Sequence, residues 1–339
     1  MTVQWYPGHM AKARKTLEEN LKLVNIVIEL CDARLPYSSR NPAIDRIIGK
    51  KPRVLVFNKA DLADPVQSEY WMDYYKKQGF TMVFTDAKAG DGVKKVIAAV
   101  NKAMEEKVNR SLERGRIATT LYAMVVGIPN VGKSSFVNKV AGKAAAKTGD
   151  RPGVTREKQW LSMGEDIYLL DTPGLLWPRI DNQFAAMRLA ASGAVKDEVV
   201  DTGELCAFLL TFIDSHYPGA LEARYGIRIP ETEEFEDTGY VTETILGAER
   251  LAKGLAILEA CGKARGCLVK GGSVDLGRAA ALVLDDYRAG KIGKISLDFP
   301  EVLDEEVDIS LRNEEAARVK EEKRAARKAN YRSRKNAKR

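Results

Sequence analysis

The chain has 339 residues, of which 45% are hydrophobic and 30% charged, and a net charge of +7; this suits a folded protein of two domains, or of one large domain with an appendage. No apolar run approaches the roughly 18 residues of a membrane span, and the N-terminus lacks the charged-then-apolar layout of a secretory signal, so we expect a cytoplasmic protein. The four cysteines are scattered and form no CxxC pair, which favours reduced thiols over a zinc site.

Short apolar and β-branched runs in the first half of the chain predict buried strands. Helical stretches such as Glu69–Gln78 and Gly92–Val108 lie between most of them. Alternation of this kind predicts an α/β fold with a doubly wound, mostly parallel sheet. The predicted strands are Val24–Leu30, Val54–Phe57, Met82–Phe84, Leu121–Val126 and Ile167–Leu170.

The predicted strands end in polar or turn-forming residues, where ligands bind in open α/β sheets. One such end carries Asn58-Lys59-Ala60-Asp61. The Asp61 carboxylate can accept hydrogen bonds from guanine N1 and N2, and adenine lacks this pair of donors. The stem of Lys59 can stack along the base, and Asn58 can tie the loop to the phosphate side. This motif therefore predicts guanine specificity.

A second polar segment, Thr85-Asp86-Ala87-Lys88, ends the next predicted strand. We expect Asp86 and Ala87 to border the base, with the backbone N–H of Ala87 reading guanine O6.

The segment Gly127-Ile128-Pro129-Asn130-Val131-Gly132-Lys133-Ser134 matches the pattern GxxxxGK[ST] of phosphate-binding loops. A predicted strand precedes it and a helical run, Ser135–Val140, follows. We expect the loop to bind the nucleotide phosphates through backbone N–H groups, with Lys133 neutralising the β- and γ-phosphates and the Ser134 hydroxyl as a Mg²⁺ ligand. The residues expected to contact GTP in this segment are Asn130, Val131, Gly132, Lys133, Ser134 and Ser135.

Two further segments predict switch loops around the γ-phosphate. Asp171-Thr172-Pro173-Gly174 follows an apolar strand about 40 residues after the phosphate loop. Asp171 is expected to hold Mg²⁺ through water, and the N–H of Gly174 to bind the γ-phosphate. Between the two motifs, Arg151–Thr155 suits a mobile switch, and Thr155 is a candidate second hydroxyl ligand of Mg²⁺.

After about Pro178, helical periodicity replaces the strand pattern. We predict a nucleotide-binding domain over 1–178, a helical RNA-binding domain over 179–300, and an acidic linker with a basic tail over 301–339. Residues 312–339 hold 12 basic and 4 acidic residues, so the tail is expected to bind polyanions such as RNA. The predicted helices are Gln183–Ala194, Thr202–Phe212, Val241–Cys261 and Val274–Ala289, and the basic residues at helical spacing are Arg250, Lys253, Lys263, Arg265, Lys270, Arg288, Lys291 and Lys294.

The order of these motifs is a circular permutation of the Ras-like order, because the base motif precedes the phosphate loop. Together with Trp5–Ala13 and Cys31–Pro36, the motif set resembles the YlqF/RbgA family, the ribosome biogenesis GTPases A, over about residues 3–300. The resemblance implies a permuted GTPase that binds immature large ribosomal subunits and promotes their late maturation. We expect GTP and GDP as ligands, Mg²⁺ as cofactor and a monomeric state.

Hydrolysis needs a group that orients the attacking water. Ras-like switches place a glutamine directly after DxxG, but here that residue is Leu175. The resemblance assigns a role in hydrolysis to His9, and the alternative is a packing or RNA-facing histidine. The other histidine, His216, lies in the helical part and is expected to be structural.

Asn130 is a second candidate for a role in hydrolysis. In GTPases with a similar GxPNxGKS pattern this asparagine coordinates K⁺, which supplies positive charge near the phosphates. The alternative is a polar loop residue that bonds its own backbone.

Two rival functions remain open at this level. A P-loop kinase or ATPase is disfavoured by the two base motifs. A non-hydrolysing RNA-binding scaffold that uses GTP structurally is kept open by Leu175. In either GTP-binding case, the permuted order joins the DTPG loop directly to the helical domain, so nucleotide state is expected to set the pose of that domain on RNA.

Overall fold

The computed structural model describes residues 8–114, 120–141, 160–164, 166–170, 172, 182–230, 246–301 and 303. The chain divides into two compact units, Met1–Asp298 and Phe299–Arg339. All of the strands and helices considered below belong to the first unit.

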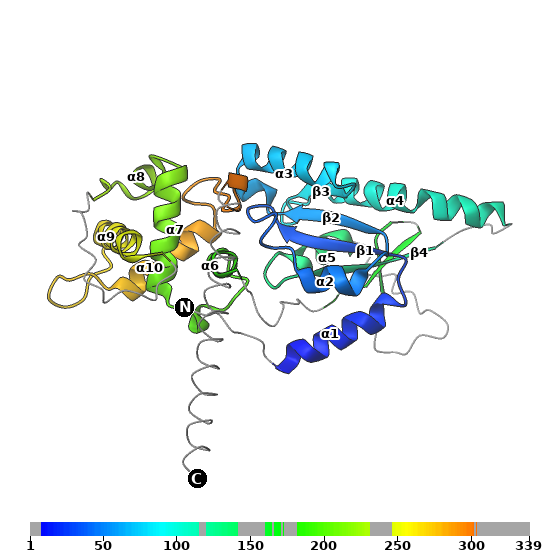
Figure 1. Cartoon of the computed structure of the whole chain (residues 1–339), viewed down its shortest axis with the longest axis horizontal. Helices are drawn as coiled ribbons and strands as arrows, with labels where there is room; N and C mark the ends of the chain where they lie inside the picture. Colours follow the sequence, from blue (N-terminus) through cyan, green and yellow to red (C-terminus); the bar gives the residue numbers. More distant parts are fainter. Residues whose placement is uncertain are drawn as a thin grey trace, which may run out of the picture. The chain divides into compact units, whose positions relative to one another are not determined.

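A six-stranded sheet organises the first half of the chain, in the order β3-β2-β1-β4-β6-β5 (Figure 1). All neighbouring strands are parallel except β5 and β6, which are antiparallel. This confirms the predicted α/β class with a mostly parallel sheet. The strands are β1 (Ile26–Asp32), β2 (Arg53–Asn58), β3 (Thr81–Thr85), β4 (Leu121–Gly127), β5 (Trp160–Ser162) and β6 (Ile167–Leu170).

The five predicted strands all appear in the sheet, because each contains a nearly continuous apolar run. Strands β1, β2 and β4 are almost fully buried, whereas β3 is partly exposed. All seven residues of β1, for example, are buried. The sequence analysis missed β5, which has only three residues and pairs antiparallel with β6. A strand this short contains too few residues to show a periodicity of its own.

Helices cover both faces of the sheet (Figure 1). Asp64 begins α3 by accepting a hydrogen bond from the N–H of Val66, and Pro65 occupies the first helical position. The longest helix among the described residues, α4, buries Val96, Val100 and Met104. The helices of this part are α1 (Gly8–Leu21), α2 (Pro42–Ile48), the short 3₁₀ helix η1 (Ala60–Leu62), α3 (Pro65–Lys77), α4 (Val93–Glu113) and α5 (Lys133–Ala141).

Residues 182–298 are helical wherever the structure describes a regular element. Asparagine or aspartate caps begin three of these helices, at Asn182, Asp201 and Asp275. Within the described ranges, no helix is both long and apolar enough to cross a membrane. The elements are α6 (Gln183–Ala191), η3 (Asp197–Val199), α7 (Thr202–His216), α8 (Ala220–Tyr225), α9 (Ala248–Ala264) and α10 (Leu276–Arg288).

The strand register brings the carboxyl ends of β1, β2 and β3 together. Asp32 pairs with Asn58 across β1 and β2, and Asn58 pairs with Thr85 across β2 and β3. Gly127, at the end of β4, lies beside Leu30 of β1. The base motifs and the phosphate loop therefore start from one edge of the sheet.

Candidate guanine nucleotide site

The predicted phosphate loop connects β4 to α5, which begins at Lys133. Lys133 is only 8% exposed, and its ammonium group donates a hydrogen bond to the carbonyl of Ile128 at 2.7 Å. The ammonium thus lies inside the loop, where a phosphate would replace a carbonyl oxygen as its partner. Ser134 and Ser135 are exposed in the first turn of α5.

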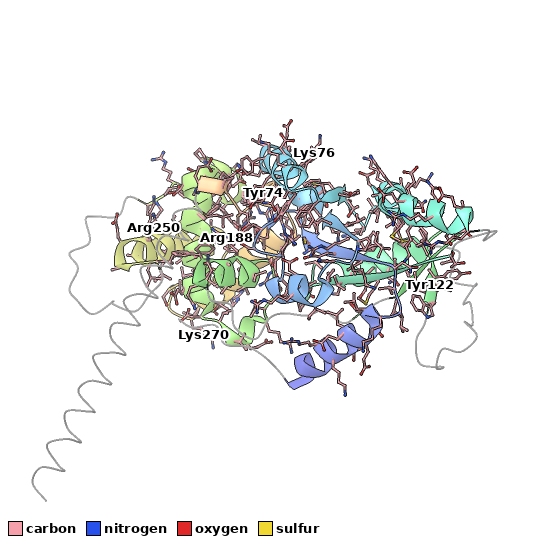
Figure 2. The ribbon with its side chains drawn as sticks, turned by 45° about the vertical axis from the view of Figure 1, so that its right-hand side comes forward. Tyr74, Lys76, Tyr122, Arg188, Arg250 and Lys270 are labelled. Carbon is pink, nitrogen blue, oxygen red and sulfur yellow. The ribbon has the colours of Figure 1, made fainter. Side chains whose placement is uncertain are left out.

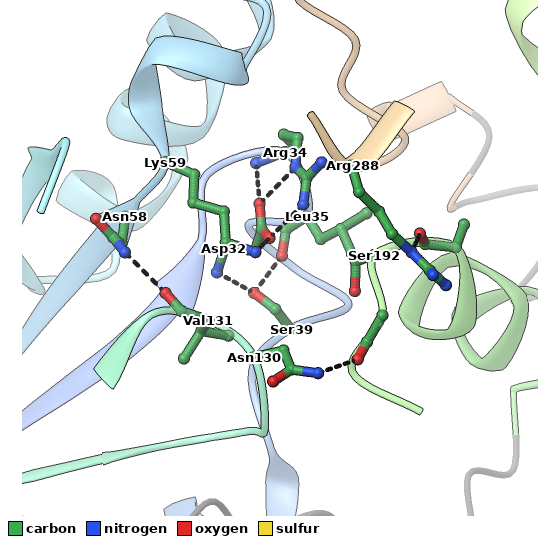
Figure 3. A network of polar contacts seen from close by, with 12 residues as sticks. Asp32, Arg34, Leu35, Ser39, Asn58, Lys59, Asn130, Val131, Ser192 and Arg288 are labelled. Carbon is green, nitrogen blue, oxygen red and sulfur yellow. Dashed lines mark hydrogen bonds and ion pairs between the residues drawn. The ribbon is translucent and has the colours of Figure 1, made fainter. Parts of the chain in front are cut away.

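Gly132 allows the base loop to approach the phosphate loop. Its φ is +92°, and a Cβ at this position would lie 2.3 Å from Nδ2 of Asn58. That nitrogen donates a hydrogen bond to the carbonyl of Val131 at 2.8 Å (Figure 3). Only glycine combines this backbone conformation with so short an approach.

Asn58 links three segments of the site. Besides its bond to Val131, its side-chain oxygen accepts hydrogen bonds from the N–H of Ala87 at 2.9 Å and from the hydroxyl of Thr85 at 3.2 Å. The structure therefore brings together Asn58 and the phosphate loop, as the sequence suggested. The N–H of Ala87, which we expected to read guanine O6, has Asn58 as its partner here.

The remaining residues of the base motifs lie beside Asn58. Lys59 has a left-handed backbone, with φ of 63°, and its ammonium contacts Asp32 at 2.8 Å. Asp61 lies in η1 and its side chain is exposed to solvent, so its carboxylate can accept hydrogen bonds from a ligand. Asp86 accepts the N–H groups of Lys88 and Ala89 and so stabilises its own turn.

Asn130 also has a left-handed backbone, with φ of 60°. Its side-chain nitrogen donates a hydrogen bond to the carbonyl of Gly193, which follows α6, at 2.5 Å (Figure 3). The phosphate loop thus contacts the helical part through this side chain.

Several predicted site residues fall outside the described part of the chain. These are the side chain of His9, the whole of Thr155, Asp171 and Gly174, and Leu175 of the second switch. Thr172 is described, and its hydroxyl donates to the carbonyl of Val125 in β4 at 2.5 Å. This bond ties the start of the DTPG segment to the strand that leads into the phosphate loop.

His216 has the surroundings of a packing residue. Its Nδ1 lies 2.9 Å from the carbonyl of Phe212, one helical turn earlier, and its ring stacks on that of Phe212 with 4.1 Å between centroids. Both contacts lie within α7, which is the kind of environment expected for a structural histidine.

The basic residues predicted for an RNA-binding face have mixed surroundings. Arg250 and Lys270 are exposed at the surface of the helical part (Figure 2), whereas the side chain of Arg288 is only 23% exposed. Considering only acidic groups that the structure describes, four of the eight are paired, and these pairs reduce the positive charge available to a polyanion. The pairs are Lys253–Asp214, Lys263–Glu259, Arg288–Asp197 and Lys291–Asp286.

Sequence reasoning missed a cluster of charged residues beside the base motif. Asp32 ends β1, and its side chain, like that of Arg34, is only 1% exposed. The two form an ion pair in which Arg34 donates from Nε and Nη2 at 3.0 and 2.8 Å. The signal available in the sequence was an acidic and a basic residue two positions apart, directly after an apolar strand.

The residues described here could supply part of a Mg²⁺ site. The exposed hydroxyl of Ser134 is an oxygen donor of the kind that Mg²⁺ prefers. Within the described ranges, no group of three or more histidine, cysteine or acidic side chains could hold a metal ion.

Comparisons with known proteins agree on one family. Residues 122–232 match the family model described as "50S ribosome-binding GTPase". The chain is 44% identical to Ribosome biogenesis GTPase A of Bacillus cereus over 91% of this chain and 97% of that protein. It is 34% identical to Mitochondrial ribosome-associated GTPase 1 of Bos taurus over 87% of this chain and 88% of that protein.

A solved structure supports the same relationship. The crystal structure of GNP-bound YlqF from T. maritima superimposes with a TM-score of 0.57 and 26% sequence identity, covering 86% of this chain and 99% of that one. These relatives are named as GTPases, so the scaffold alternative without turnover is not favoured.

Proposed function

The chain belongs to the ribosome biogenesis GTPase A family and is a GTP hydrolase, and from this membership we propose that it binds the large ribosomal subunit and promotes its late maturation. GTP hydrolysis is the switch that ends this binding. Family membership supports the proposed partner, and the single structural observation that supports the nucleotide site is the bonding of Asn58 to both Val131 and Ala87. It joins a guanine motif to a phosphate loop in one site.

The roles of individual residues form part of the proposal. Asp61 accepts the two guanine hydrogens, and Lys59 stacks along the base. Lys133 neutralises the β- and γ-phosphates after leaving the carbonyl of Ile128, while the loop N–H groups surround the β-phosphate. Asp86 and Ala87 border the base, Asn130, Val131, Gly132 and Ser135 border the phosphates, and Gly174 contacts the γ-phosphate.

Mg²⁺ would be held by Ser134 and Thr155, with Asp171 acting through water. When bound, the ion supplies positive charge that stabilises the leaving and transferred phosphates. The protein side chains position the nucleotide in line for attack by water. Leu175 cannot orient that water because it has no hydrogen-bonding group, so we assign this role to His9.

The central experiment measures GTP turnover with and without purified large ribosomal subunits in potassium buffer. We expect slow intrinsic turnover and at least a tenfold stimulation by large subunits, which corresponds to about 1.4 kcal/mol of barrier. Small subunits serve as the control and are expected to give no stimulation. Equal turnover with both subunits would contradict the proposed partner.

The role of His9 gives a first specific prediction. The His9→Ala variant is expected to keep its GTP affinity but to lose the stimulated turnover by about 100-fold, the scale of a lost general acid–base or positioning group. His216→Ala is the matched control because it removes the only other histidine in the sequence, which contacts Phe212 within α7. Unchanged stimulated turnover in His9→Ala would overturn the assignment.

Cation dependence tests the role of Asn130. We propose that its side-chain oxygen coordinates K⁺ beside the phosphates while its nitrogen stays bonded to Gly193. Turnover is then faster in KCl than in NaCl at equal ionic strength. Equal rates would count against a potassium site.

The location and the partner surface complete the proposal. We propose a cytoplasmic monomer whose helical domain, together with the basic tail, contacts ribosomal RNA. The DTPG segment leads into that domain, so GDP and a non-hydrolysable GTP analogue should give different RNA footprints. Identical footprints would refute this coupling.

A further inference from the structure

Asp32 lies at the centre of a buried polar network at the end of β1. Its Oδ1 accepts hydrogen bonds from the backbone N–H and from Nε of Arg34, both at 3.0 Å. Its Oδ2 accepts from Nη2 of Arg34 and from Nζ of Lys59, both at 2.8 Å. Figure 3 shows the side chains of Arg34 and Lys59 converging on this carboxylate.

The charges in this network fix the position of Lys59. Burial by itself raises the pKa of Asp32, but the charges of Arg34 and Lys59 outweigh that effect and hold the pKa well below its usual range. The carboxylate is therefore ionised at every physiological pH. Lys59 has a left-handed backbone that is unfavourable for a residue with a side chain, and its ion pair stabilises the loop in that conformation.

Arg34 connects the same network to the helical domain. Its Nη1 donates to the carbonyl of Tyr287 in α10 at 3.4 Å, and its guanidinium carbon lies 4.8 Å from the centroid of the Tyr287 ring. The carbonyl of Arg34 also accepts the N–H of Leu297 at 2.9 Å. One buried arginine thus touches both the base-side carboxylate and α10.

A second contact joins α10 to the base motif. The turn after α10 contains Gly290, where a Cβ would lie 2.6 Å from Cδ2 of Leu62. Leu62 belongs to η1, the same 3₁₀ helix that carries Asp61. The helical domain therefore packs directly on the segment that is assigned to guanine recognition.

We propose that Asp32 is a positioning residue for guanine recognition, because it holds Lys59 against the base. Through Arg34, it also makes nucleotide affinity depend on the position of α10. The inference rests on the proposed assignment of Asn58–Asp61 to the guanine base. By reciprocity, any partner that displaces α10 weakens guanine nucleotide binding, and bound nucleotide opposes that displacement.

The first test compares two ligands in the full-length Asp32→Asn variant. GDP uses both the base loop and the phosphate loop, whereas inorganic tripolyphosphate uses the phosphate loop alone. We expect about a tenfold loss of GDP affinity, because the amide cannot pair with two cations, and unchanged affinity for tripolyphosphate. Equal losses for both ligands would mean a merely structural role and overturn the proposal.

The second test acts on the α10 end of the network and leaves the buried ion pair intact. Tyr287→Leu removes the ring beneath Arg34 and is expected to weaken GDP binding about threefold to tenfold, the scale of one cation–π contact. Tyr287→Phe is the matched control, because the Tyr287 hydroxyl has no hydrogen-bond partner among the residues that the structure describes. Identical GDP affinities in the two folded variants would overturn the proposal, even where Asp32→Asn is too unstable to purify.

A third variant separates this inference from the assignment beneath it. Asp61→Asn should lose GDP affinity and gain affinity for xanthosine diphosphate, whose base presents an acceptor where guanine presents a donor. If Asp61→Asn leaves GDP affinity unchanged, both the base assignment and this inference fail. If Asp61→Asn switches specificity while Asp32→Asn and Tyr287→Leu bind GDP as the wild type does, only this inference fails.

Discussion

Individual glycines and polar side chains decide how closely the loops of this site approach one another. Gly132 lets Asn58 reach the carbonyl of Val131. The side-chain nitrogen of Asn58 donates a hydrogen bond and its side-chain oxygen accepts one, so a residue with only a donor or only an acceptor cannot replace it. The geometry of the nucleotide site therefore depends on single atoms at these two positions.

Replacing Gly132 with alanine tests this close approach. The added Cβ collides with Asn58 and should lower GDP affinity by more than about tenfold, which is 1.4 kcal/mol. Gly79→Ala is the matched control, because Gly79 also has a positive φ, of +80°, but no atom within 4 Å of the added Cβ. We expect the control to cost about 1 kcal/mol of stability and no GDP affinity, as measured by isothermal titration calorimetry. Normal affinity in Gly132→Ala would contradict the collision.

The ion pair between Asp197 and Arg288 gives a pH-dependent prediction. Arg288 donates to both oxygens of Asp197 and to the carbonyls of Ala190 and Ala191, which closes the end of α6. Hydrogen bonding from Arg288 lowers the pKa of Asp197. Because the folded pKa lies below the unfolded one, the contribution is complete above about pH 4 and is lost as the pH falls further.

Asp197→Asn should therefore reduce the free energy of unfolding by about 1 kcal/mol at neutral pH. The difference from the wild type should stay constant from about pH 7 to pH 5 and shrink below about pH 4. Urea unfolding at several pH values measures this difference in the free energy of unfolding. Glu259→Gln, which removes an exposed ion pair with Lys263, is the control with little expected effect. A difference that persists undiminished at about pH 3 would count against the ion pair as its cause.

At the scale of elements, close helix packing holds the helical part of the first unit together. Helix α9 crosses α7 at Gly254, where a Cβ would lie 2.4 Å from Cα of Ala207. Nine consecutive residues of α7, Leu205–Ile213, are buried. A small residue is required at the crossing because the two backbones approach each other directly.

Gly254→Ala should destabilise the protein by about 1–3 kcal/mol, because the overpacking outweighs the gain in helix propensity. Gly277→Ala is the matched control in α10. Its nearest neighbour would lie 3.5 Å from the Cβ, so this change should stabilise the protein by up to about 1 kcal/mol. Thermal unfolding followed by circular dichroism measures both variants. Stabilisation by both alanines would show that the helices can separate without cost.

At the scale of the whole first unit, residues near its end complete structures formed near its beginning. The Asp298 carboxylate accepts the N–H groups of Tyr37 and Ser38 and the Ser38 hydroxyl, and its backbone carbonyl accepts Nε1–H of Trp71. Ser296 contacts Asp64 and Tyr217. The nucleotide-binding and helical parts are therefore joined by buried polar contacts as well as by the DTPG connection.

Asp298→Ala should lower the free energy of unfolding by about 3 kcal/mol. It leaves the buried N–H of Ser38 and the partly buried N–H of Tyr37 without their acceptor, and it removes the carboxylate 3.6 Å from the buried Arg188. Glu301→Ala, at an exposed position three residues later in the chain, is the control and should change stability by less than about 0.5 kcal/mol. Chemical denaturation of both variants without nucleotide provides the measurement. A loss as small as that of the control would mean that the network around Asp298 contributes little.

The sequence by itself determined the α/β class, the motif order and the family, because these depend on residue type and spacing along the chain. Apolar runs fixed the five longer strands, and turn residues fixed their ends. Only the tertiary structure showed that the N–H of Ala87 donates to Asn58 and that Asn130 donates to the carbonyl of Gly193. It also showed that Arg34 contacts both Asp32 and α10. Such contacts join residues up to 253 positions apart, and they depend on how helices pack, which local periodicity does not encode.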